Sequence, residues 1–272
     1  MNTSRRRLAK AAVGVVPTFL LTTGAAAPPV ASVLWPGAKP FSVDYDGYYE
    51  SDSTDLRIAS GRLRFEPLSS VSATLEGQDV VPPTGLAPAN AGGYRVSLLV
   101  DSLLATLRYE SVGWIDADGL HPLGYREERK LPFRSLKRRE VRYLYDDRAP
   151  SAPLANGVKL LRVPTGAQDR LSIIVHLCLM ARANPGLFVD GQRMNLPFAG
   201  FSDVRDARMR VGRIEPVARG PLGLKARRIE RANSDRDDLG IEMWLEPTAA
   251  PLPVALRLSE SSKALYFVVD RG

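Results

Sequence analysis

The chain has 272 residues, of which 44% are hydrophobic and 25% are charged, and its formal net charge is +7. This is the composition of an ordinary globular protein and excludes a disordered or fibrous one. One cysteine, Cys178, allows no intrachain disulfide, and the two histidines, His121 and His176, lie far apart, so no metal-ligand spacing occurs. We therefore expect neither a metal nor another cofactor.

Residues 1–27 predict an export signal. A basic cluster (Arg5, Arg6, Arg7 and Lys10) precedes an apolar run over residues 11–21, and small residues follow at 24–27. The paired arginines also resemble a twin-arginine signal. The apolar run is short of the roughly 20 residues that cross a bilayer, so no stable transmembrane span is expected after cleavage. A disordered basic tail and a membrane anchor are the alternative interpretations.

Removal of this segment changes what the charge implies. The segment holds four basic residues and no acid, so the formal net charge falls from +7 to +3 for the rest of the chain. An exported protein with so mild a charge is not expected to bind nucleic acid.

The rest of the chain reads mainly as strands. Residues 28–40 form an extended, proline-rich lead-in, and residues 41–272 form a single β-rich domain. Residues 56–65 alternate apolar and polar side chains, which is typical of a strand in a sheet with one solvent-exposed face. Residues 66–92 indicate a strand fragment followed by a long loop. Further strands are expected at 94–100, 105–115, 119–129 and 138–145, with a turn at 116–119.

One segment has helical spacing instead. Thr165 and Gln168 stand at capping-box spacing, and residues 169–182 are apolar nearly all round, which predicts a buried helix. Strands return at 186–198, as a hairpin, and at 207–217, 223–231, 240–247, 252–258 and 265–269. The pattern predicts a mainly β fold, an antiparallel barrel or half-barrel with one buried helix at about 169–182 against its mouth or concave face.

Three motifs carry a resemblance to a known family. They are Gly119-Leu120-His121-Pro122, the run from Pro164 to Ser172, and Trp244-Leu245-Glu246-Pro247 followed by Leu252-Pro253-Val254. In this order and spacing, residues 41–270 resemble family 3108 of the domains of unknown function. The resemblance implies an exported protein of Gram-negative bacteria, hence a periplasmic location, and a β-rich half-barrel or barrel with a helix on its concave side. It implies no reaction, and the proline-rich stretch 76–92 departs from the family pattern.

The sharpest catalytic hypothesis is an acid, a hydroxyl and an imidazole on one helical stripe. Asp169, Ser172 and His176 follow one another at spacings of three and four residues. A nucleophile in mid-helix without flanking oxyanion-hole glycines is unusual for a hydrolase. The alternative is structural: Asp169 favours the helix start, and the stripe bonds to neighbouring strands.

Arginines on expected strands give a ligand-binding hypothesis. Several of them would form a basic wall if they shared one sheet face, and arginine forks suit carboxylates and phosphates. The arginines are Arg126, Arg129, Arg138, Arg142, Arg208, Arg210, Arg213, Arg227 and Arg228. The ligand-binding candidates are Arg126, Arg142, Arg208 and Arg210 and, separately, His121. The alternatives are an ordinary outer face on which the arginines pair with glutamates and, for His121, a structural hydrogen bond in a loop.

The sequence thus favours a non-catalytic periplasmic protein. It would bind an amphipathic or anionic envelope component, a lipid or a glycan, in a cavity lined by apolar strand faces and closed by the helix. The alternatives are an envelope hydrolase that uses Asp169, Ser172 and His176, and a structural adaptor that binds another envelope protein through a sheet edge.

Overall fold

A computed structural model of the chain describes residues 38–49, 57–75, 77–145, 158–231, 240–260 and 263–270. They form one 13-stranded sheet, a separate two-stranded hairpin, the helix α1 (Ser172–Ala183) and the short 3-10 helix η1 (Pro185–Leu187). The predicted fold class is confirmed: the protein is mainly β, with an open, half-barrel-like sheet. The predicted signal 1–27 and most of the lead-in 28–40 lie outside the described residues. Within these residues, no helix is both long and apolar enough to cross a membrane.

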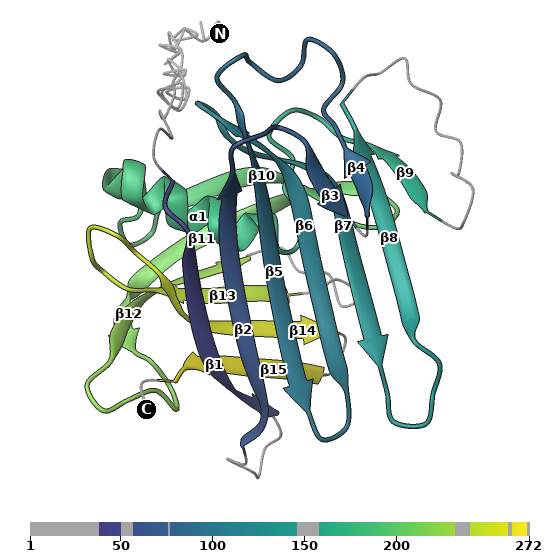
Figure 1. Cartoon of the computed structure of the whole chain (residues 1–272). Helices are drawn as coiled ribbons and strands as arrows, with labels where there is room; N and C mark the ends of the chain where they lie inside the picture. Colours follow the sequence, from purple (N-terminus) through teal and green to yellow (C-terminus); the bar gives the residue numbers. More distant parts are fainter. Residues whose placement is uncertain are drawn as a thin grey trace, which may run out of the picture. The chain divides into compact units, whose positions relative to one another are not determined.

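The large sheet follows the order β10-β11-β12-β13-β14-β15-β1-β2-β5-β6-β7-β8-β9. Neighbouring strands are antiparallel, except that β9 runs parallel to β8. The first strand lies beside the last, since Tyr45 of β1 pairs with Val269 of β15. The N-terminal and C-terminal strands therefore meet in the middle of the sheet (Figure 1). The strands from β1 to β9 are β1 (Phe41–Tyr49), β2 (Arg57–Leu68), β5 (Gly92–Ser102), β6 (Thr106–Asp116), β7 (Gly119–Lys130), β8 (Lys137–Leu144) and β9 (Lys159–Arg162). Those from β10 to β15 are β10 (Arg193–Ala199), β11 (Val204–Pro216), β12 (Lys225–Arg231), β13 (Gly240–Leu245), β14 (Pro253–Glu260) and β15 (Lys263–Val269).

Apolar and polar side chains alternate along the strands, so one face of the sheet is apolar and packs around a single core. In β2, Leu63 and Phe65 are fully buried, whereas Arg62 and Arg64, which alternate with them, face solvent. The same period of two places Met243 and Phe267 in the core from the other half of the sheet. Both halves thus turn their apolar faces toward a shared interior.

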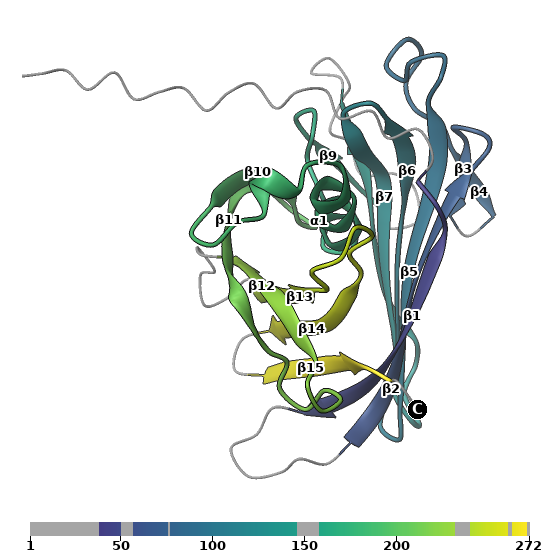
Figure 2. The ribbon, with the colours of Figure 1, turned by 90° about the vertical axis from the view of Figure 1, so that its left-hand side faces the viewer.

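Helix α1 occupies that interior. Every residue from Ser172 to Ala181 is buried, and its apolar side chains belong to the same core cluster as the inner faces of the strands. Figure 2 shows α1 between the long strands and the β10–β12 part of the sheet. A helix that is apolar nearly all round is expected in such a place. The apolar side chains of α1 thus pack against the strand faces that were predicted to line a ligand cavity.

The start of α1 also differs from the prediction, which placed it at residue 169 behind a Thr165/Gln168 capping box. The helix begins at Ser172, and Gln168 joins the sheet instead. The Gln168 N–H donates to Pro197 O at 2.8 Å, and the Ala199 N–H donates to Gln168 O at 2.8 Å. The same stretch starts beside β8, where the Val163 N–H donates to Leu144 O at 2.9 Å. Residues 163–168 thus connect the two edges of the open sheet.

The proline-rich stretch covers the outer face of β6 and β7. It contains a small hairpin, β3 (Ala73–Leu75) and β4 (Gln78–Val80). Leu75 is fully buried in a second cluster with Val112, Trp114 and Leu123. The stretch that the sequence predicted as mostly loop therefore contains a hairpin that packs against β6 and β7.

Candidate functional site

Asp169 and Ser172 form a reciprocal cap at the start of α1. Asp169 Oδ1 accepts from the Leu171 and Ser172 N–H groups, each at 2.8 Å, and Ser172 Oγ accepts from the Asp169 N–H at 2.9 Å. The Ile173 N–H donates to Asp169 O at 3.1 Å, so helical hydrogen bonding starts from Asp169. This is the geometry of a capping box. Two members of the predicted catalytic stripe are thus brought together, in a structural arrangement.

Asp169 also anchors a buried polar chain. Ser111 Oγ donates to Asp169 Oδ2 at 2.6 Å, and the Tyr94 hydroxyl lies 3.2 Å from Ser111 Oγ. Asp169 and Ser111 are both fully buried, and burial raises the pKa of Asp169 from 3.8 to about 6 against the opposing effect of these hydrogen bonds.

His176, the third member of the stripe, faces strand β7. The Leu120 N–H donates to His176 Nδ1 at 3.5 Å, and the imidazole is 6% exposed. Burial, and then the nearby His121, lower the pKa of His176 from 6.5 to about 4, so the ring is neutral at pH 7. Because Asp169, Ser172 and His176 are all buried, a substrate has no route to them in this conformation.

His121 also has structural partners. Its Nε2 lies 2.9 Å from Asp116 Oδ1, and its ring stacks on Trp114 with centroids 4.6 Å apart. Burial raises the pKa of Asp116, but hydrogen bonds from His121 and others outweigh it, and the net pKa is lowered. His121 is 3% exposed, so it offers no surface to a ligand in this conformation.

The predicted basic wall divides into two separate groups. Arg126 on β7 and Arg142 on β8 lie in the first half of the sheet, and Arg208 and Arg210 lie on β11 in the second half. In the first group, Arg126 bonds to Glu110 at 2.9 Å and Arg142 to Glu140 at 2.8 Å. These two arginines therefore belong to a ladder of alternating charges across β5–β8.

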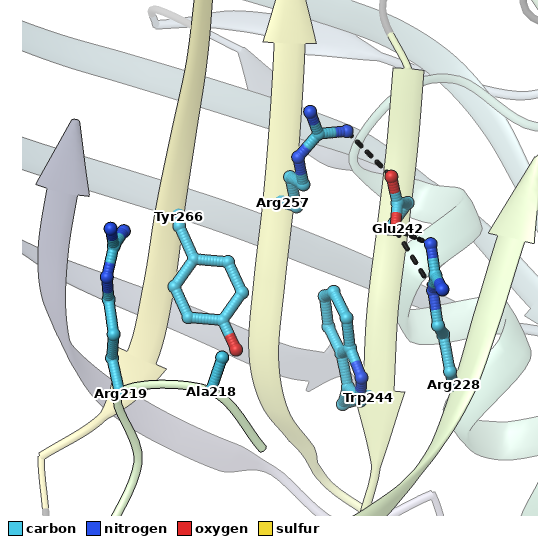
Figure 3. Close-up of a pocket in the computed structure, with 7 residues that line it drawn as sticks. All are labelled: Ala218, Arg219, Arg228, Glu242, Trp244, Arg257 and Tyr266. Atoms are coloured by element: carbon cyan, nitrogen blue, oxygen red, sulfur yellow. Dashed lines mark hydrogen bonds and ion pairs between the residues drawn. The ribbon is translucent and has the colours of Figure 1, made fainter. Parts of the chain in front are cut away.

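The second group leads to an open pocket on the outer face of β12–β15. Its volume is about 550 Å³, and it is lined by Ala218, Arg219, Arg228, Glu242, Trp244, Arg257 and Tyr266 (Figure 3). Trp244 and Tyr266 pack edge to face, with centroids 5.5 Å apart. The Arg228 guanidinium lies 5.7 Å from the Trp244 ring centre, and that of Arg219 lies 6.0 Å from the Tyr266 ring centre. Three cations thus surround an aromatic pair.

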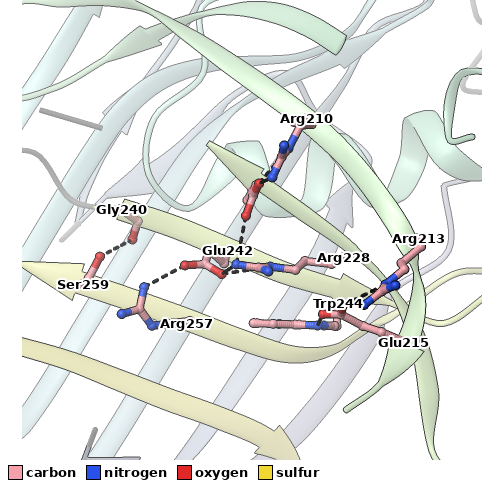
Figure 4. A network of polar contacts seen from close by, with 10 residues as sticks. Arg210, Arg213, Glu215, Arg228, Gly240, Glu242, Trp244, Arg257 and Ser259 are labelled. Carbon is pink, nitrogen blue, oxygen red and sulfur yellow. Dashed lines mark hydrogen bonds and ion pairs between the residues drawn. The ribbon is translucent and has the colours of Figure 1, made fainter. Parts of the chain in front are cut away.

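Alternating charges hold the arginines of this pocket in place. Glu242 accepts from Arg228 at 2.6 Å and from Arg257 at 2.7 Å, and Glu230 joins Arg228 to Arg210 (Figure 4). Burial lowers the pKa of Arg228, but its hydrogen bond and charge interaction with Glu242 outweigh this, and the net pKa is raised. Arg210, one of the predicted ligand-binding residues, therefore supports the pocket from its rim through Glu230.

The position of Trp244 follows from the register of β13. Ile241, Met243 and Leu245 point into the core, so Glu242 and Trp244 face outward. The Trp244 Nε1–H donates to Glu215 at 3.0 Å, which fixes the orientation of the indole. The Trp-Leu-Glu-Pro motif contained this residue, but no sequence pattern indicated that Arg219, from the loop between β11 and β12, would lie beside it.

Both histidines and the cysteine lie in the described part of the chain. Among the described residues, no group of three His, Cys, Asp or Glu side chains is arranged to hold a metal ion. Cys178 is buried in α1, and burial raises the pKa of its thiol.

Comparisons with known proteins provide structural similarity but no family. No family model and no curated protein matches the chain, so the resemblance to family 3108 gains no support from them. Among solved structures, the chain is similar to a beta-barrel-like protein of the domain of unknown function DUF1849 from Brucella abortus, with 15% identity and a TM-score of 0.42. The match covers 85% of this chain and 95% of that one.

Proposed function

We propose that this chain is a non-catalytic, exported protein that binds an anionic component of the cell envelope, such as an acidic glycan or a phosphorylated headgroup. The observation that carries the proposal is the outer pocket, in which Arg219, Arg228 and Arg257 surround Trp244 and Tyr266. Guanidinium forks match carboxylate and phosphate oxygens. Trp244 and Tyr266, which are 7% and 5% exposed, add an apolar lining between the arginines.

The electrostatics of the pocket favour an anion. Glu242 is the one acidic residue in its lining, and it is shared between Arg228 and Arg257. An anionic ligand could exchange for part of this shared contact without leaving a buried charge alone, because Arg228 and Arg257 are both about one-third exposed.

The compartment is the second part of the proposal. The order basic, apolar, small in residues 1–27 supports export, and the motif resemblance to family 3108 supports a periplasmic location in a Gram-negative bacterium. A reporter that is active only outside the cytoplasm, fused after Gly37, is expected to be active. Retention of the fusion protein in the cytoplasm would contradict the proposed periplasmic location.

Tryptophan fluorescence tests the pocket directly. In a Trp35→Phe/Trp114→Phe background, Trp244 is the remaining indole, and titration with galacturonate, glucose 6-phosphate and inorganic phosphate is expected to change its emission. The double variant Arg228→Gln/Arg257→Gln is expected to weaken binding at least about tenfold, since each charge-assisted bond contributes about 1.5–3 kcal/mol.

Two controls sharpen the result. Glu242→Gln removes the competing carboxylate and is expected to strengthen binding. Arg62→Gln, at an exposed arginine paired with Asp44 on β2, is expected to leave it unchanged. Absence of any response to all three anions, or equal affinity in the double variant, would refute the proposed site.

A further inference from the structure

Two neighbouring hairpin tips expose large apolar side chains at one end of the sheet. Leu103 and Leu104, between β5 and β6, are 94% and 76% exposed, and Phe133 and Leu136, between β7 and β8, are 108% and 53% exposed. The strands β6 and β7 pair down to Thr106 and Lys130, so the two tips lie side by side (bottom of Figure 1). We call residues 102–105 and 131–136 the apolar tips.

A cationic collar lies directly behind the apolar tips. Residues 129–139 contain six basic residues and no acid, and all six are exposed. Arg134 belongs to the second tip itself, and the other five flank that tip: Arg129, Lys130, Lys137, Arg138 and Arg139. Arg138 bonds to Glu140 at 2.6 Å, and Arg139 lies over the Phe201 ring. The exposed Asp101 is an acid beside the first tip. Positive charge is thus concentrated on the β7–β8 side.

Phe133 occupies a strained backbone position. The Arg134 N–H donates to Leu131 O at 3.3 Å, which closes a turn with Pro132 and Phe133 at its centre. Phe133 has φ +59°, a value that favours glycine at this place in a turn. Its side chain is fully exposed, so packing within the protein does not compensate for the strain. A costly aromatic residue that stabilises nothing inside the molecule points to a role outside it.

We propose that the apolar tips insert into the surface of an anionic lipid bilayer. Phe133, Leu103 and Leu104 would enter the boundary between headgroups and acyl chains, while the collar binds anionic headgroups. Apolar side chains at the furthest reach, with cations behind them, match this layering. The surface is separate from the outer pocket, since the tips join β5–β8 and the pocket lies on β12–β15.

Vesicle co-sedimentation tests the proposal on the chain from residue 28 onward, which contains the compact unit Ser32–Gly272. The protein is expected to sediment with vesicles of phosphatidylglycerol and phosphatidylcholine more than with phosphatidylcholine alone. Phe133→Gly is expected to lower the partition coefficient about tenfold, the effect of losing one large apolar side chain. Because glycine relieves the strained φ, its thermal midpoint is expected to equal or exceed that of the wild type.

Matched variants separate the possible outcomes. Leu222→Ser, at an equally exposed leucine in the loop between β11 and β12, is expected to bind as the wild type does. Phe133→Trp is expected to shift its emission to the blue when anionic vesicles are added. Wild-type partitioning of Phe133→Gly would overturn the proposal. Loss of binding in Arg228→Gln/Arg257→Gln without loss in Phe133→Gly would also overturn it and would assign lipid binding to the pocket.

Discussion

At the scale of single residues, Asp169 makes the stability of this protein depend on pH. Its pKa is about 6 in the folded chain and near 3.8 when exposed, because the folded state buries it. Between these values the unfolded chain releases the proton first, so stability falls as pH rises from about 4 to about 6. The shift of about two pKa units corresponds to about 3 kcal/mol.

Asp169→Asn is expected to remove this loss. The amide oxygen still caps the Leu171 and Ser172 N–H groups, and no charge is buried. Urea unfolding at pH 4, 5, 6 and 7 should show the variant gaining stability over the wild type as pH rises to 6, and then a constant difference. Asp101→Asn, at an exposed carboxylate, serves as the control. An unchanged difference across this range would mean that Asp169 does not titrate there.

His176 has the opposite effect. Burial lowers its pKa from 6.5 to about 4, so between these values the unfolded chain takes up a proton and the folded chain does not. Stability is therefore lost as pH falls from about 6.5 to about 4. The stability of His176→Gln relative to the wild type should therefore rise as pH falls from about 6.5 to about 4, whereas that of Asp169→Asn should rise as pH increases. A relative stability that changes with pH in the same direction in both variants would contradict the assigned environments.

The sequence placed these residues on one stripe but did not reveal their role. Spacing alone predicts that Asp169 and Ser172 are neighbours on a helix, and the structure brings them together. It does not show that the stripe faces Ser111 on β6 and Leu120 on β7, because those contacts join residues 58 and 56 positions apart. Burial, which decides between a cap and a catalytic group, depends on such contacts.

At the scale of elements, the β3–β4 hairpin lies in a stretch that the sequence predicted as a strand fragment followed by a long loop. Strands of three residues are too short to show a period of two, whereas the long alternation in β2 was recognised. Leu75→Ala should cost about 2–5 kcal/mol, because it leaves a cavity over Trp114.

Urea unfolding and acrylamide quenching of Trp114 would check this expectation. The quenching should increase in Leu75→Ala if the hairpin shields the indole. Leu86→Ala, at a leucine that is 39% exposed in the following loop, should have little effect on either measurement. Equal stability of the two variants would show that the hairpin is not part of the core.

At the scale of the whole molecule, the order of the strands in the sheet could not be predicted from the sequence. Most of the long strands were recognisable from local alternation, although none was predicted at β1 or β9. In addition, β1 and β15 pair across more than 200 residues, and no local pattern specifies that pairing. The same fact explains why the predicted basic wall divides. Arg142 and Arg210 are both outward on their strands, but nine other strands lie between β8 and β11 in the sheet order.

The β1–β15 pair also predicts that the two halves unfold together. Phe267 of β15 is fully buried and packs edge to face with Tyr45 of β1. Its ring also fills the space that a side chain at Gly61 on β2 would occupy. Phe267→Ala should therefore cost about 3–5 kcal/mol in both halves at once.

Trp114 and Trp244 report on the two halves separately, since one lies on β6 and the other on β13. With Trp35 replaced by Phe, single-tryptophan variants should give the same urea midpoint from either indole, and Phe267→Ala should lower both equally. A shift confined to the Trp244 signal would mean that the C-terminal strands form a separate unit. The seam between the first and last strands would then not couple the two halves, and the open sheet would be two sheets placed side by side.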